Sequence, residues 1–166
     1  MKEFDYKIDY KKIDFKKPEN RQLYRIGRGE QGVLLVRPYT DSICKFWRFK
    51  TPQSARKSAE KIYRMFESYK QRDDFIGMDM CRKFLEMGFT RARRYANHKD
   101  GKKYDINGNV KPQEPDALTS NKALSAKIFK NMRDLAAYDE KYQMMRKQWR
   151  DNENEIWTSN SRTTKN

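Results

Sequence analysis

The predicted fold depends most on residues 23–36, which read LYRIGRGEQGVLLV. Two short apolar runs, residues 23–26 and 33–36, flank a turn that contains three glycines. Apolar and aromatic runs of this length, separated by a glycine-rich turn, are typical of paired β-strands. We therefore predict an antiparallel pair of strands in this stretch.

The segments on either side of this pair extend the predicted sheet. From Phe4 to Tyr10 aromatic and apolar residues alternate strictly with charged ones, which is the period of a strand or an extended arm. A turn at residues 38–41 is followed by ICKFWRF at 43–49, which we expect to form the next strand. Residues 4–49 thus predict a small antiparallel sheet.

Beyond Thr51 the apolar residues recur at helical spacing. Thr51 is a good helix cap and Pro52 suits the first turn. Gly88 is a natural helix stop, and Thr90 can cap the helix that follows. We predict four helices, at residues 52–70, 74–87, 91–97 and about 120–149.

These elements make one α+β domain of residues 1–150, in which helices pack on the small sheet. It is β-rich over 4–49 and helical over 52–149, with an exposed loop at 99–119. Residues 151–166 are polar and almost without apolar anchors, so we expect a flexible tail.

Composition favours a folded, basic protein outside the membrane. The 166 residues include 38 Lys+Arg against 23 Asp+Glu, a net charge of +15, yet 13% are aromatic, too many for a disordered chain. No apolar run reaches the roughly 18 residues that cross a bilayer, and the N-terminus lacks the features of a signal peptide. Two cysteines make no disulfide framework, so we expect a cytoplasmic protein.

The positive charge is concentrated in one part of the chain. Residues 45–104 carry 17 Lys+Arg and 7 Asp+Glu, a net charge of +10. Arginine forks bind phosphate oxygens and aromatic rings stack on bases, so we predict a groove that binds DNA or RNA. The alternative is a solvated face paired with nearby carboxylates. The predicted groove residues are Lys45, Trp47, Arg48, Lys50, Arg82, Lys83, Arg91, Arg94, Tyr95, His98, Lys99, Lys102 and Lys103.

Residues 27–32, GRGEQG, match the pattern G-x-G-x-x-G. A dinucleotide site needs a helix directly after this pattern, whereas a strand is predicted here. Strands on both sides are similar to the glycine-rich loop of protein kinases, but no H-R-D or D-F-G motif follows. Two hypotheses stay open: a structural turn with positive φ, or a nucleotide site of a small enzyme or sensor. The second would use Arg25, Gly27, Arg28, Gly29, Gly32 and Lys45.

No catalytic constellation emerges, so we assign no catalytic residues, no metal ligands and no cofactor. Asp73 and Asp74 are better explained as helix caps, and Glu86 as an ion-pair partner, than as magnesium ligands. Whether the chain is an enzyme stays open. A third class of function is an adaptor whose basic face binds an acidic host protein.

Four blocks resemble a known family: YRIGRGEQGVL at 24–34, WRFKTP at 47–52, DFIGMDM at 74–80 and GFTRARRYANH at 88–98. The family is a domain of unknown function from bacteria and large tailed phages of the T4 type, and the likeness covers about residues 4–147. The resemblance implies a one-domain cytosolic protein and brings no catalytic residues. It also implies that the blocks form one site, with these residues near each other: Arg25, Arg28, Glu30, Trp47, Arg48, Arg91 and Arg94.

Overall fold

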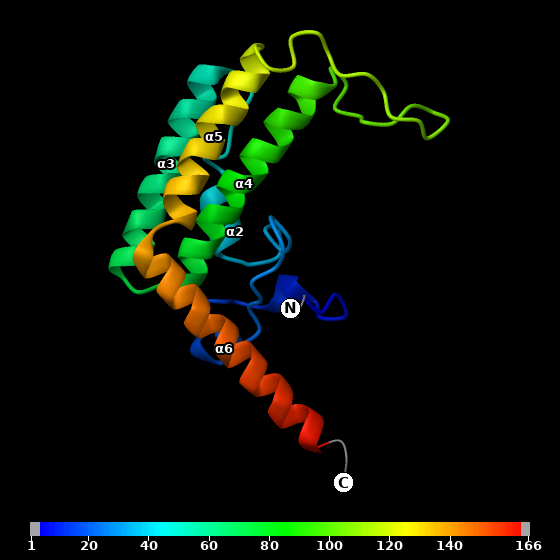
Figure 1. Cartoon of the computed structure of the whole chain (residues 1–166). Helices are drawn as coiled ribbons and strands as arrows, with labels where there is room; N and C mark the ends of the chain where they lie inside the picture. The colour runs from blue at the N-terminus through cyan, green and yellow to red at the C-terminus, as the bar shows by residue number, and fades with distance from the viewer. Residues whose placement is uncertain (1–3, 164–166) are drawn as a thin grey trace.

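The computed structural model describes the backbone of residues 4–163 and the side chains of residues 4–153. Three long helices lie side by side, and a fourth extends away from one end of this bundle (Figure 1). The bundle helices are α3 (Pro52–Gln71), α4 (Phe75–Asn97) and α5 (Asn121–Ala137), and the extending helix is α6 (Glu140–Thr163). Short helices precede them: η1 (Tyr10–Lys12), α1 (Pro18–Arg21) and α2 (Tyr39–Cys44).

The predicted α+β fold is wrong, because residues 4–163 contain no β-strand. Their one β-type feature is an isolated bridge between Tyr104 and Val110, in the loop before α5. The predicted strand at 43–49 overlaps α2, and residues 23–36 form irregular chain and successive tight turns. The architecture is a helical bundle whose N-terminal segment packs beside α4 (Figure 1).

In residues 23–36, side chains supply hydrogen-bond partners for backbone groups that would be paired with a neighbouring strand in a sheet. The backbone N–H of Ile26 donates to a carboxylate oxygen of Glu153 at 3.1 Å. Thr40 Oγ1 accepts from Val36 N and donates to the Val33 carbonyl. A buried segment can stay irregular when its polar groups find such partners. The apolar residues of this segment therefore mark burial, since Ile26, Val33 and Val36 are in the core.

Helix α3 begins as predicted, which confirms the helix expected over residues 52–70. The Thr51 hydroxyl accepts from Ser54 N at 3.1 Å, and the Ser54 hydroxyl accepts from Thr51 N at 3.0 Å. This reciprocal pair is a capping box, with Pro52 in the first turn. Asp74 caps α4 with a single hydrogen bond, by accepting from Gly77 N at 3.2 Å.

Gly88 does not end a helix, and the two helices predicted at 74–87 and 91–97 are the single helix α4. A Cβ on Gly88 would lie only 2.4 Å from the ring of Phe129 on α5. The glycine therefore lets α4 and α5 approach closely at this level. Its conformational permissiveness is not needed here, and Thr90 lies inside the helix instead of at its cap.

The long helix predicted at 120–149 is divided in two. Ser120 begins α5 by accepting from Ala123 N at 3.1 Å, and the helix ends at Ala137. Asp139 then starts α6 by accepting from Tyr142 N at 2.9 Å, while it also pairs with Lys70 of α3 at 2.5 Å.

Helix α6 continues through residues 151–163 of the predicted tail, and residues 164–166 lie outside the described chain. Within the described residues, no helix is both apolar and long enough to cross a bilayer.

Candidate nucleic-acid interface

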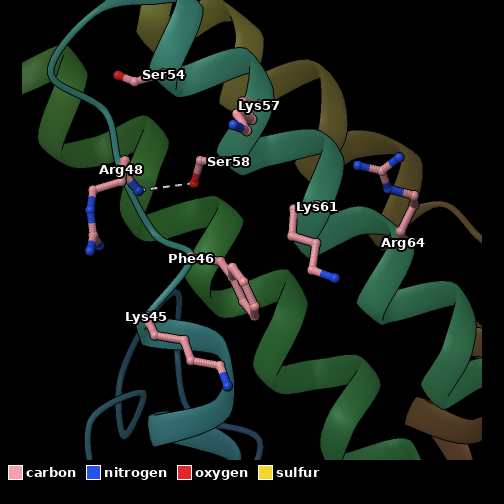
Figure 2. A pocket seen from close by; sticks show the side chains of 8 residues that line it. All are labelled: Lys45, Phe46, Arg48, Ser54, Lys57, Ser58, Lys61 and Arg64. Atoms are coloured by element: carbon pink, nitrogen blue, oxygen red, sulfur yellow. Dashed lines mark hydrogen bonds between the residues drawn. The ribbon is translucent and has the colours of Figure 1, made fainter.

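Five cations line a hollow between α3 and the segment that follows α2. This hollow, of about 370 Å³, is called the basic hollow, and Figure 2 shows the side chains around it. The backbone N–H of Arg48 donates to the Ser58 hydroxyl at 2.9 Å, which fixes the segment against α3 (Figure 2). Its lining residues are Lys45, Phe46, Arg48, Ser54, Lys57, Ser58, Lys61 and Arg64.

The charge of the basic hollow is uncompensated. Its lining includes no carboxylate, and none of its five cations forms an ion pair with any side chain of residues 4–153. The ammonium groups of Lys45 and Lys61 instead lie 5.2 and 4.8 Å from the centre of the Phe46 ring. A ring face attracts cations but does not neutralise them. The hollow thus presents a positive field to any anion.

A second hollow, of about 330 Å³, adjoins the first through Arg48. It is called the aromatic hollow. The rings of Phe49 and Tyr95 are stacked with 6.5 Å between their centres, and Tyr95 is 40% exposed. The ammonium of Lys122 lies 5.5 Å from the Phe49 ring and also donates to the Lys50 carbonyl. The lining residues are Trp47, Arg48, Phe49, Lys50, Tyr95 and Lys122.

Sequence reasoning found only part of this surface. It named Lys45, Trp47, Arg48, Lys50 and Tyr95, all of which line one of the two hollows. It missed the cations that α3 and α5 supply, namely Lys57, Lys61, Arg64 and Lys122. The sequence did carry a signal for the cations on α3, because residues 54, 57, 61 and 64 recur at helical spacing between the positions of the buried stripe.

The remaining predicted groove residues lie elsewhere on α4 and its C-terminal loop. Arg91 is half-buried one turn before Tyr95, and Arg94 is exposed. His98 is buried at the end of the helix. The lysines of the loop, Lys99, Lys102 and Lys103, are exposed.

Lys83 and Arg82 belong to a buried ionic cluster, which we call the Asp79 cluster: Tyr24, Asp79, Arg82, Lys83 and Tyr142. Asp79 is fully buried and accepts from Tyr24, from Tyr142 at 2.6 Å and from Arg82 at 3.0 Å. Burial alone would raise the pKa of Asp79, but the charges of Arg82 and Lys83 and the two hydroxyls hold this pKa well below its usual range. The carboxylate is therefore ionised and fully satisfied.

Lys83 is likewise fully buried and points into the glycine-rich turn. Its ammonium donates to the Gln31 carbonyl at 2.8 Å and lies 3.8 Å from Asp79. Burial lowers the pKa of Lys83 to about 8, against the opposing attraction of Asp79. Because its contacts are all inside the protein, Lys83 is not placed to meet a polyanion.

The glycine-rich turn has a structural use in this fold. Gly29 and Gly32 both have positive φ, and a Cβ on Gly32 would lie 2.2 Å from the Phe4 ring. The turn directs the carbonyls of Gln31 and Gly29 toward Lys83 and Arg82. Carbonyl oxygens repel phosphate, so this geometry favours the hypothesis of a structural turn over that of a nucleotide site.

The blocks named in the resemblance meet along α4. Glu30 accepts from the Thr90 hydroxyl at 2.6 Å, which joins the glycine-rich turn to the second half of the helix. The Trp47 ring packs against Phe84 with 6.4 Å between centres. Arg25 and Arg28 lie with the turn, and Arg48 with the two hollows.

The chain belongs to the family described as "Domain of unknown function (DUF4385)", which matches residues 5–152. The match includes both hollows, the Asp79 cluster and the glycine-rich turn. No curated protein and no solved structure is significantly similar to the chain.

Proposed function

We propose that this protein binds single-stranded nucleic acid, DNA or RNA, across the basic and aromatic hollows. The observation that carries the proposal is that, within the described side chains, five cations without ion pairs line one hollow, which shares Arg48 with a second, aromatic hollow. The basic hollow would hold the phosphate backbone, and the aromatic hollow would stack on a base. Cations beside exposed rings are the usual means of binding single strands without sequence preference.

The charge distribution supports phosphate as the ligand. Like charges that lack counter-charges repel one another, and a bound phosphate backbone would relieve this repulsion. Each cationic side chain that replaces a condensed counterion on a phosphate makes binding more dependent on salt. The predicted groove is accordingly moved from the length of α4 to the segment after α2, the outer face of α3 and the first turn of α5.

The biological setting follows from the family resemblance and the chemistry. We propose a phage-encoded accessory protein that acts on nucleic acid in the cytoplasm of a bacterial host. Cys44 and Cys81 are free thiols, with Cys81 buried, which suits a reducing compartment.

The test is fluorescence anisotropy with labelled single-stranded DNA, single-stranded RNA and duplex DNA of equal length, over a salt series. We expect single strands to bind more tightly than the duplex, with a steep salt dependence. The double variant Lys57→Gln/Lys61→Gln should reduce the salt slope by about one unit for each phosphate that is no longer neutralised. The matched control, Arg146→Gln/Lys147→Gln, removes the same charge elsewhere on the surface and should leave the slope unchanged.

Stacking is tested separately with Tyr95→Ala. This variant should weaken single-strand binding by about 1–3 kcal/mol and leave duplex binding unaffected, because only an unpaired base can reach the ring. Equal binding by both double variants and the wild type would contradict the proposed surface. Competition by poly-glutamate as strong as that by nucleic acid would instead support an adaptor for an acidic protein.

A further inference from the structure

A third hollow lies between α4 and α6, and shares no lining residue with the other two. We call it the α4–α6 hollow. Its volume is about 480 Å³, which falls within the roughly 300–1,000 Å³ of small-molecule sites. Its polar lining consists of Arg82, Tyr142, Gln143, Arg146, Lys147 and Arg150.

Four of these residues are cations, and the three on α6 share a face of that helix. Residues 143, 146, 147 and 150 recur at intervals of three and four, so they line the hollow together. Within residues 4–153, Arg146 and Lys147 form no ion pair. One terminal nitrogen of Arg150 pairs with Glu153 at 3.3 Å. Its other terminal nitrogen is buried without an acceptor among these residues.

The charge of Arg82, which α4 contributes to the hollow, is already neutralised. Arg82 is held by Asp79, whose oxygens also accept from Tyr24 and Tyr142. The oxygens of Asp79 accept hydrogen bonds within the Asp79 cluster, and those of Glu153 accept from Arg150 and from the Ile26 backbone. Neither carboxylate therefore cancels the charge of Arg146 and Lys147. The hollow keeps a net positive charge that faces its open side.

We infer that the α4–α6 hollow binds a small ligand that carries two or more linked phosphate groups. Within the described side chains, Arg146 offers a guanidinium fork without an ion pair, Lys147 an unpaired ammonium and Arg150 one unpartnered terminal nitrogen. A single phosphate would not use all of these donors. Tyr142 is buried at the base of the hollow, so its lining offers no exposed ring on which a base could stack. Recognition would therefore rest on the phosphate groups alone. This inference does not depend on the proposed nucleic-acid interface.

The experiment is isothermal titration of the full chain with inorganic tripolyphosphate, pyrophosphate and orthophosphate at constant ionic strength. We expect affinity to rise with the number of phosphate groups, and ATP to bind no more tightly than tripolyphosphate. The variant Arg146→Gln/Lys147→Gln should weaken tripolyphosphate binding at least tenfold. Both residues lack ion pairs within the described side chains, and circular dichroism would verify that the helical fold is kept.

The matched control is Lys57→Gln/Lys61→Gln in the basic hollow, which should change tripolyphosphate binding less than twofold. Equal weakening by both double variants would mean general charge attraction and would overturn the inference. So would the absence of binding at millimolar tripolyphosphate. Because nucleic-acid binding is expected to respond to the two variants in the opposite way, failure of one proposal is distinguishable from failure of the other.

Discussion

Replacing Asp79 by asparagine tests whether the Asp79 cluster holds the fold together. The substitution keeps the shape of the side chain but removes the charge that compensates Arg82, at 3.0 Å, and Lys83, at 3.8 Å. Removing one partner of a buried ion pair costs about 3–5 kcal/mol, because the other charge is left uncompensated. In a chain of this length such a loss lowers the melting temperature by about 6–20 °C.

The assay is urea unfolding followed by circular dichroism, at pH 7 and at pH 9.5. Since the pKa of Lys83 is lowered to about 8, this lysine is mostly neutral at pH 9.5 and only Arg82 then lacks its partner. The destabilisation should therefore be smaller at pH 9.5 than at pH 7. Asp41→Asn is the control, because the exposed pair of Asp41 with Arg37 should contribute less than about 1 kcal/mol. A loss below about 1 kcal/mol at pH 7 for the Asp79 variant would refute the reasoning.

Three further predictions concern the packing and titration of the core. Alanine favours helix, but Gly88→Ala should destabilise the fold by about 1–3 kcal/mol in urea unfolding, because its Cβ would meet Phe129. Unchanged stability would contradict the close approach of α4 and α5. The pKa values of Asp74 and Asp79 are lowered from 3.8, so the stability that these two carboxylates contribute above pH 4 should be lost as the pH falls toward 2. In acid-unfolding curves, stability should fall less steeply with pH for Asp79→Asn than for the wild type. In the alkaline range, Lys83 releases its proton near pH 8 in the folded protein but near pH 10.5 in the unfolded chain, so the free energy of unfolding should rise between these values. The slope of this free energy against pH should be lower in Lys83→Met. Equal slopes for the variant and the wild type would exclude this titration.

Local signals predicted the helices better than they predicted the fold class. Thr51 and Asp74 cap their helices through side chains that the sequence places directly before an apolar stripe. The sheet prediction failed because the apolar runs of residues 23–36 mark burial and do not identify the side chains that pair with the backbone. Those partners are Lys83, Glu153 and Thr40. A local sequence pattern does not identify them, because they are distant in the sequence or pair through a side-chain hydroxyl.

The residues of the candidate site were likewise predicted only in part. Trp47 was named because an aromatic ring beside cations can stack on a base, whereas Phe49 and the cations on α3 were not named. Lys83 was placed in the groove because a fully buried lysine is rare. Only the three-dimensional contacts distinguish a lysine that closes a turn from one that attracts a ligand.

The contact between Glu153 and Ile26 joins two segments that lie 127 positions apart in the sequence. Tyr142 and Trp149 also reach back to Tyr24, through the Asp79 cluster and through an indole hydrogen bond at 3.3 Å. During synthesis the N-terminal segment emerges well before its partners on α6. The backbone N–H of Ile26 and the carbonyl of Tyr24 therefore have to stay in water until α6 has left the ribosome.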